Sequence, residues 1–460
     1  MNLLLSLLVT IWVGVLIFKR YKAQTVLFIA GIMLMIITVI FHFGNGTILP
    51  AKQATGFFLF DVFEFIRQTF SSRAASLGLN IMAVGGFARY MDHIGASRAL
   101  VNLTIKPLLK FKSPYIVMSS CWALGMIIGL AINSASGLAM LLMVTMYPVL
   151  VALGVSRLSA TAAIATTLCL DWSPSDTGTI LAAELSGLDP VTYWHSFQVP
   201  ITLCVFPVVA ILHYFTQKYM DKRAGHIVAP EIVEVQLQEG QQKQTETPPL
   251  IYAILPIIPL SLILIFSDLW ISWIKMDIIK AMFIGVSCGM IAQYIRHRDG
   301  KRVCNDLQVF FDGLGLQMAN VVTLIVAGET FAKGLMAIGT IDTLIQGAQN
   351  SGFGAIGLTL VMVAIIGVCS VIMGSGNAPF FAFANLVPDI AAKTGVAAAF
   401  MILPMHFIAS SARAISPITA VIVVTAGMAN ISPFDLVKRT AIPMLGAIIT
   451  LVTANFILFY

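Results

Sequence analysis

Apolar runs long enough to cross a lipid bilayer recur along the whole chain, and they constrain its fold more than any other feature. Residues 25–43 and 438–459 are two such runs, and short charged loops separate most of the others. A helix needs roughly 20 apolar residues to cross the hydrocarbon core. Charged residues make up 10% of the 460 positions, against about 25% in a soluble domain. We therefore expect an all-α polytopic membrane protein with about ten spans.

The positions of the basic residues predict how the first span is oriented. Residues 3–18 are apolar, have no basic residue before them and are followed by Lys19, Arg20 and Lys22. A cleavable signal would carry its basic residues first, so this run is expected to be a retained span. Cytoplasmic loops carry the excess of Lys and Arg, which puts the N-terminus outside. A nucleic-acid-binding surface would need a basic face with aromatic platforms, and the sequence shows none.

The two halves of the chain resemble each other at a nearly constant offset. The matches are residues 87–89 with 331–333 at an offset of 244, and residues 173–174 with 416–417, Pro190 with Pro433 and Pro200 with Pro443 at 243. Scattered identities arise by chance, but three prolines matched in one register, one of them within a Ser-Pro pair, are not expected to. The sequence therefore predicts an internal repeat.

Each repeat is expected to hold five membrane-spanning helices and one re-entrant hairpin. The predicted units are a first repeat at 1–216 with a hairpin at 114–153 and a broken helix at 157–183, a cytoplasmic linker at 217–249, and a second repeat at 250–460 with a hairpin at 354–392 and a broken helix at 398–426. An odd number of crossings inserts the second copy from the opposite side, which gives two inverted repeats with their broken helices at the midplane. Both termini would then be periplasmic. Residues 57–70 are expected to form a separate interfacial helix before a span at 77–95.

Polar residues interrupt both hairpins and both broken helices, and transporters built this way bind substrate where such interruptions meet. Broken helices expose N–H groups that attract anions, and freed carbonyls can hold a cation. The candidate substrate-binding residues are Asn133, Ser134 and Ser136 in the first tip, Ser173, Ser175 and Thr177 in the first break, Ser375, Gly376 and Asn377 in the second tip, and Arg413, Ser416 and Thr419 in the second break.

Arg413 is the charged residue that most needs an explanation, because an unpaired Arg in a span is costly. Its planar fork suits a carboxylate. At the repeat offset Asp171 aligns with Ala414, so Arg413 and Asp171 are near equivalents. Two interpretations follow: Arg413 binds a substrate carboxylate, or the two side chains neutralise each other.

Asp171 and Asp176 are candidates for ion coupling, through either a proton or a bound cation. Asp176 has an alternative structural role, because the sequence Asp-Thr-Gly after Pro174 is typical of a helix restart with an N-cap. His406 lies one turn before the second break, and a lone intramembrane His is usually a packing residue. Glu329 is expected to be a scaffold or helix-end residue.

Other function classes find little support in the sequence. There is no G-x-x-x-x-G-K-[ST] motif, so transport energy is expected from ion or substrate gradients. No nucleophile, His and acid stand at a convincing spacing, which argues against an enzyme. The six scattered cysteines suggest no metal site and no cofactor is expected, although Na⁺ at the hairpin tips is a candidate.

Three motifs resemble the anaerobic C4-dicarboxylate carriers of the DcuC type: GSGNAPFFAFANLVP at 374–388, ISPITAVIVVTAGMANISPFDLVKRT at 415–440 and YMDHIGA at 90–96. The likeness covers nearly the whole chain and is weakest at 224–249. It implies a protein of the ion-transporter superfamily: a homodimer in the bacterial inner membrane, embedded in lipid, with a scaffold and a mobile transport domain. By this resemblance, the tip at 374–377 and the break with Arg413 and Ser416 are the binding elements.

The resemblance also implies the cargo, which is succinate, fumarate, malate and, as a further candidate, aspartate. The implied activity is symport, exchange or efflux coupled to H⁺ or Na⁺. However, the run LDWSPSDTG at 170–178 is more acidic than the family pattern. Two carboxylates near an anion site repel a dianion unless they are protonated, cation-bound or paired. An amino-acid or other small organic-anion transporter of the same fold therefore remains an alternative, as does an anion channel.

Overall fold

The computed structural model describes residues 8–9, 12–16, 19, 21–41, 48–50, 53–105, 113–226, 248–339 and 354–460. Within these ranges the regular structure is helical and contains no strand. Six segments there are long and apolar enough to cross a membrane: Ala23–Phe41, Pro190–Arg223, Ile278–His297, Gly300–Ala337, Gly354–Met373 and Pro433–Phe459. This confirms the prediction of an all-α, multi-pass membrane protein. Much of the predicted span at 3–18 and most of the predicted linker at 217–249 lie outside the described residues.

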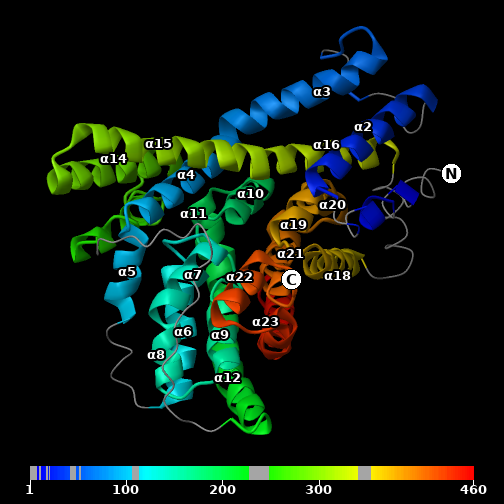
Figure 1. Ribbon diagram of the computed structural model, residues 1–460. Coiled ribbons are helices and arrows are strands. Elements are labelled where there is room, and N and C mark those ends of the chain that lie inside the picture. Colours follow the sequence, from blue (N-terminus) through cyan, green and yellow to red (C-terminus); the bar gives the residue numbers. More distant parts are fainter. Residues whose placement is uncertain are drawn as a thin grey trace.

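Long helices that cross one another form one layer of the molecule, which we call the long-helix layer (Figure 1). It consists of α2 (Ala23–Phe41), α3 (Phe58–Arg73), η1 (Ala74–Gly78), α4 (Leu79–His93), α5 (Ala96–Ile105), η4 (Leu250–Ile254), α13 (Ile257–Ile265), α14 (Ile278–His297), α15 (Gly300–Gln317), η5 (Met318–Val322) and α16 (Thr323–Ala337). Helix α2 packs along α16, and α14 and α15 pack along α4.

The prediction that the helix at 57–70 is separate from the span at 77–95 is wrong, whereas its interfacial position stays a prediction. Helices α3, η1 and α4 follow one another without a gap, so residues 58–93 form one continuous helix. The physical reason is that no proline stands in this stretch to remove a backbone hydrogen bond. A single π-helical turn, η1, joins α3 to α4, so the irregularity in this stretch does not break the helix.

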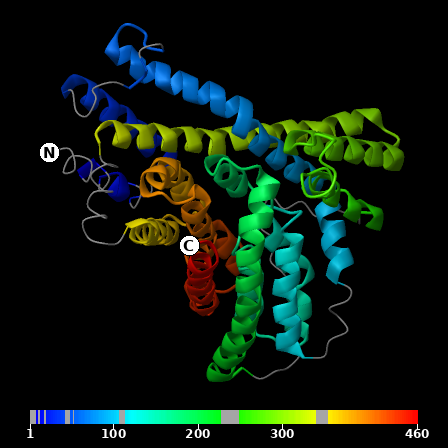
Figure 2. The ribbon, with the colours of Figure 1, turned by 180° about the vertical axis from the view of Figure 1, so that it is seen from behind.

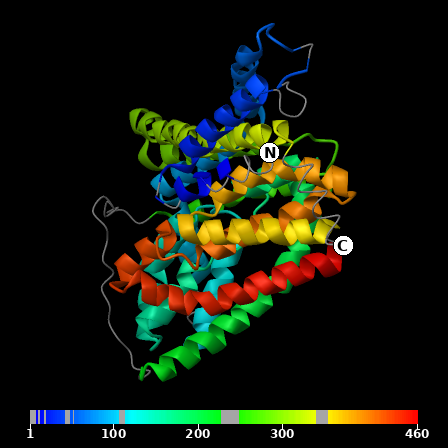
Figure 3. The same ribbon diagram turned by 90° about the vertical axis from the view of Figure 1, so that its right-hand side faces the viewer.

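The remaining elements pack into a second unit, the broken-helix body, which lies against the long-helix layer (Figure 2). It consists of α6 (Pro114–Ile128), α7 (Ala135–Thr145), α8 (Tyr147–Ala152), α9 (Arg157–Ala165), α10 (Thr177–Leu185), α11 (Pro190–Tyr193), η3 (Trp194–Gln198), α12 (Val199–Arg223), α18 (Gly354–Met373), α19 (Asn377–Phe383), η6 (Ala384–Leu386), α20 (Val387–Thr394), α21 (Ala398–Arg413), α22 (Ala420–Ala429) and α23 (Pro433–Phe459). Helices α12 and α23 lie side by side along it (Figure 3).

Both helix interruptions contain the Ser-Pro pair that the sequence singled out. The first separates α9 from α10 and the second separates α21 from α22. Proline lacks an N–H group and disfavours helix at the residue before it, which explains both interruptions. Helix α9 packs against α22 and α10 against α21, so each half of one broken helix meets the opposite half of the other. This crossing brings the two interruptions together.

The elements of the two halves begin in the register of the sequence repeat. The π-helical turns start at Ala74 and Met318, which are 244 residues apart. Helices α10 and α22 start 243 residues apart, as do α11 and α23. Opposite insertion of the two copies stays a prediction.

The two predicted hairpins differ in length, and helix α12 revises one boundary. Helices α6 and α7 have 15 and 11 residues, too short to span, whereas α18 has 20. Whether these hairpins are re-entrant stays a prediction.

Helix α12 continues to Arg223, so the start of the linker predicted at 217 is wrong and residues 217–223 are helical. The stretch 217–223 contains neither Gly nor Pro, so nothing in it interrupts the helix.

Candidate substrate and ion site

An ion pair between the two breaks forms the centre of the candidate site. Arg413, the last residue of α21, donates from Nη2 to Asp171 Oδ1 at 2.7 Å and to the Leu168 carbonyl at 3.0 Å. Ser410 Oγ donates to the other oxygen, Asp171 Oδ2, at 2.6 Å. The side chains of Arg413 and Asp171 are 12% and 8% exposed. The two side chains therefore form an ion pair in this conformation, and binding of a substrate carboxylate by Arg413 stays a prediction.

Side chains donate hydrogen bonds to several of the backbone carbonyls that lose their helical partners at the breaks. Ser411 Oγ donates to the Cys169 carbonyl at 2.8 Å, and Trp122 Nε1 donates to that of Thr166 at 3.0 Å. In the second break, Thr419 Oγ1 donates to the Arg413 carbonyl at 2.6 Å. Buried backbone groups need such partners. These carbonyls hold the breaks in shape, and fewer are free for a cation than the sequence suggested.

The first hairpin tip contacts the first break. Asn133 Nδ2 donates to Ser175 Oγ at 3.0 Å, and Ser173 Oγ donates to the Leu130 carbonyl at 2.8 Å. Ser134 has a structural role, because its hydroxyl accepts from the Gly137 N–H at 3.1 Å and caps α7. Two further candidates, Ser136 and Thr177, are half-buried in the first turns of α7 and α10.

The second hairpin tip packs against Arg413 through glycine. A Cβ atom on Gly376 would lie 2.6 Å from the Ala409 carbonyl oxygen and 3.3 Å from Arg413 Cδ, so only glycine allows this approach. Gly374 has φ +64° and lies against Ile418 in the second break. The neighbouring candidates are half-buried: Ser375 Oγ accepts from a backbone N–H of α19, and Asn377 begins that helix.

Several polar atoms of the site are free to bind an anion or a hydroxyl. Both hydrogen bonds that Arg413 makes to described residues come from Nη2, which leaves Nη1 and Nε. Asn133 Oδ1 and Ser416 Oγ are buried and have no hydrogen-bond partner among the described residues. Buried polar atoms are nearly always hydrogen-bonded in folded proteins. Their state here is typical of groups that meet a ligand.

A second polar group lies beside this ion pair. Asp176 Oδ2 accepts from the N–H groups of Gly178 and Thr179 at 2.8 and 3.2 Å, which confirms the predicted N-cap of α10. His406 Nε2 lies 3.5 Å from the same oxygen. Gln198 Nε2 lies 3.3 Å from His406 Nδ1. Sequence reasoning gave His406 little weight and missed Gln198, because nothing local indicates that either side chain faces Asp176.

One cluster among the described residues has the spacing of a cation site. Ligand atoms of Asp171, Asp176 and His406 all lie within 4.8 Å of one another. However, the Arg413 guanidinium already neutralises one carboxylate and repels a further cation. The Asp176 oxygen already accepts two backbone N–H groups. These three side chains are therefore better suited to binding a proton than to binding a metal ion. Na⁺ at the hairpin tips stays a prediction.

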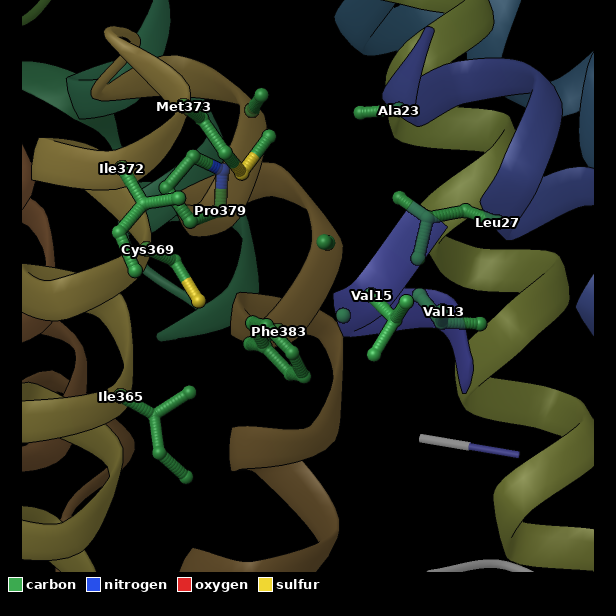
Figure 4. Close-up of a pocket in the computed structure, with 13 residues that line it drawn as sticks. Val13, Val15, Ala23, Leu27, Ile365, Cys369, Ile372, Met373, Pro379 and Phe383 are labelled. Atoms are coloured by element: carbon green, nitrogen blue, oxygen red, sulfur yellow. The ribbon is translucent and has the colours of Figure 1, made fainter. Parts of the chain in front are cut away.

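The two cavities that border the hairpin tips are too small or too apolar to hold a dicarboxylate. A void of about 10 Å³, which Asn133 and Ser175 line together with Phe87 and Pro259, separates the first tip from the long-helix layer. It has room for about one water molecule. A larger cavity of about 400 Å³ lies between α2 and the second hairpin, but its lining is apolar (Figure 4). A dianion placed there would lose its hydration without gaining partners.

The family model for the C4-dicarboxylate anaerobic carrier, DcuC, matches residues 1–460. The chain belongs to this carrier family. A Vibrio cholerae protein named probable anaerobic C4-dicarboxylate transporter DcuC is 37% identical over 459 residues, which are 100% of this chain and 98% of that one. The Escherichia coli K12 anaerobic C4-dicarboxylate transporter DcuC is 36% identical over 455 residues, covering 99% and 96%. The carrier is thus a transporter and not an enzyme.

Two solved transporters have a similar fold. The Alcanivorax borkumensis YdaH transporter superposes with a TM-score of 0.61 at 16% identity, covering 95% of the carrier and 98% of its own chain. The Neisseria gonorrhoeae MtrF efflux pump gives 0.62 at 15% identity and covers 95% of both chains. At this identity the likeness concerns the fold alone. It supports the arrangement of helices in the carrier and leaves the site residues to be tested.

Proposed function

We propose that this protein moves C4-dicarboxylates across the bacterial inner membrane, with one substrate carboxylate bound by Arg413 where the two helix breaks meet. The observation that carries the proposal is the buried Arg413–Asp171 pair at this crossing. A carboxylate that binds the free Nη1 and Nε atoms would replace a hydrated anion with charge-assisted hydrogen bonds. Succinate, fumarate and malate are the proposed cargo, with aspartate as a further candidate.

The proposed transport is coupled to H⁺ or Na⁺ and runs as symport, exchange or efflux. Asp171 and Asp176 are the proposed coupling residues, because they are the carboxylates nearest Arg413. We also propose that the two repeats are inverted, that the hairpins are re-entrant, that both termini are periplasmic and that the carrier works as a homodimer. The alternative cargo is an amino acid or another small organic anion.

Thermal stability measured across a panel of small acids tests this proposal. Purified carrier is heated with succinate, fumarate, malate, aspartate or arginine, each at two sodium concentrations and two pH values. A ligand that binds only the folded state at 100 times its Kd stabilises by about 2.7 kcal/mol. We expect the C4-dicarboxylates to raise Tm and arginine to leave it unchanged. Stabilisation by amino acids alone would favour the alternative cargo.

We propose that substrate crosses by an elevator movement of the broken-helix body against the long-helix layer. Two features support a sliding contact: the void beside the first tip is too small for substrate, and an ion pair between described residues joins the two units. Arg73 of α3 donates to Glu329 of α16 at 2.7 Å within the long-helix layer. It also donates to Glu184 of α10, across the boundary. If the body moves, Arg73 can release Glu184 and stay neutralised by Glu329.

Replacing Glu184 by glutamine is expected to populate a second position of the body. Glu184 is 38% exposed, so the pair contributes at most about 1 kcal/mol, or roughly a fivefold change in population. Spin labels at Lys301 of α15 and Lys218 of α12, in a background without the exposed Cys304, report the distance between the units. We expect a longer or shorter distance to gain population in E184Q. Identical distance distributions in E184Q and the parent would contradict the sliding contact.

A further inference from the structure

We propose that Asp176 and His406 together hold the coupling proton, and that substrate binding at Arg413 recruits it through Asp171. This inference rests on the proposed function, because it needs a substrate carboxylate on Arg413. It adds the identity of the ion and a residue, His406, that the proposal above does not use. The geometry of four side chains carries it, and each is taken in turn below.

His406 is buried and directed at Asp176. The residue is 2% exposed, and its Nε2 atom has no hydrogen-bond partner among the described residues. That atom lies 3.5 Å from Asp176 Oδ2. A Cβ atom on Gly178 would come within 2.2 Å of Nε2, so the glycine makes the approach possible. A buried imidazole nitrogen without a partner, beside a carboxylate, is arranged to share a proton with it.

Gln198 fixes which imidazole nitrogen faces Asp176. Its Nε2 group lies 2.9 Å from Thr179 Oγ1 and 3.3 Å from His406 Nδ1. An amide nitrogen donates, so Nδ1 of a neutral imidazole accepts and the ring hydrogen sits on Nε2. The N–H of the neutral ring therefore points at the Asp176 carboxylate. One added proton would leave the carboxylate neutral, or the imidazole charged beside an ionised carboxylate.

The charged groups around this pair connect it to the substrate. Asp171 and His406 face Asp176, and Arg413 in turn faces Asp171. The packed elements η3 and α19 contribute the uncharged Gln198 and Phe380, and the Phe380 ring stacks on His406 at 4.9 Å between centroids. Phe380 also places the pair next to the second hairpin, whose tip contacts Arg413.

Competition for Arg413 couples the two ligands. Without substrate, the Asp171 carboxylate is neutralised by the guanidinium. A substrate carboxylate on Nη1 and Nε takes part of that positive charge, so Asp171 becomes a less compensated anion beside Asp176. Neighbouring carboxylates favour binding of a proton to one of them. The proton comes from solvent and binds to the Asp176 carboxylate, whose Oδ2 atom the Nε2–H of the neutral His406 ring faces. Substrate and proton therefore promote each other's binding.

The pH dependence of succinate affinity tests this inference. The apparent Kd of succinate is measured by thermal shift between pH 7 and 9, where succinate itself is a dianion. If one proton binds with the substrate, Kd rises by up to about tenfold per pH unit. D176N keeps an N-cap side chain but cannot ionise, and H406Q cannot share a proton. We expect both variants to lose the pH slope.

The matched control is H195Q, which makes the same substitution at an exposed position of η3. It should keep the parent's slope. A flat pH response in the parent that still binds succinate, or a slope that persists in both variants, overturns the inference. So does a Kd that follows sodium and not pH. Absence of succinate binding at every pH overturns the proposed function itself, and this inference with it. If a variant does not fold, a flat pH response in the parent still overturns the inference.

Discussion

Replacing Arg413 by alanine is expected to reduce the initial rate of labelled succinate uptake into proteoliposomes by about 100-fold or more. The variant loses the donors for the substrate carboxylate and leaves Asp171 buried without its cation. Removing one partner of a buried pair costs about 3–5 kcal/mol, which corresponds to that range of affinity. R413K is expected to give an intermediate rate, because it keeps the charge but not the planar fork. Undiminished uptake by R413A would remove Arg413 from the site.

A double variant separates the two roles that the sequence left open for Arg413. If Arg413 only neutralises Asp171, then D171N combined with R413A removes both charges and uptake should recover. If Arg413 binds the substrate, the double variant should stay as inactive as R413A. We expect the second result. Double-mutant cycles of this kind isolate the coupling between two residues in contact.

Replacing Asp221 by asparagine is expected to destabilise the folded carrier by about 3–5 kcal/mol. Asp221 of α12 pairs with Arg439 of α23 at 2.8 Å, and their side chains are 1% and 6% exposed. Tyr115 and Ser159 also donate to this carboxylate, at 3.0 and 2.8 Å. The asparagine would leave the Arg439 charge buried and uncompensated. Thermal unfolding in detergent, followed by loss of the monodisperse elution peak, measures the effect.

A matched control exists one helical turn away. Asp435 and Lys438 form an exposed ion pair at the start of α23, with side chains 51% and 70% exposed. D435N makes the same chemical change in solvent, where such pairs contribute about 0–1 kcal/mol. We expect D435N to leave Tm close to that of the parent. Equal shifts in D221N and D435N would show that burial of the Asp221 pair has no special effect.

The buried Asp221–Arg439 pair also revises how the basic residues are read. In the sequence, Lys438 and Arg439 are adjacent basic residues that look alike. In the structure Lys438 is exposed, while Arg439 joins the two long helices of the broken-helix body. Loop charges orient a membrane protein through their position along the chain. They do not reveal which of two neighbouring charges is buried.

The sequence by itself determined the features that depend on neighbouring residues. Apolar run length predicts the membrane-spanning helices, since a helix satisfies its own backbone within one segment. The Ser-Pro pairs at 173–174 and 416–417 predict the breaks, because proline acts on its own turn of helix. The cap at Asp176 follows from the same local chemistry. The family was also recognisable from short motifs.

Only the tertiary structure decided which side chains meet. Arg413 and Asp171 are 242 residues apart in the chain, and their contact depends on how the two broken helices cross. The same holds for His406 beside Asp176 and for Arg73 between Glu184 and Glu329. No local pattern encodes such pairs, because a polar residue on an apolar helix looks the same whether it faces a partner, a cavity or lipid. Helix packing makes that choice, and with it the site.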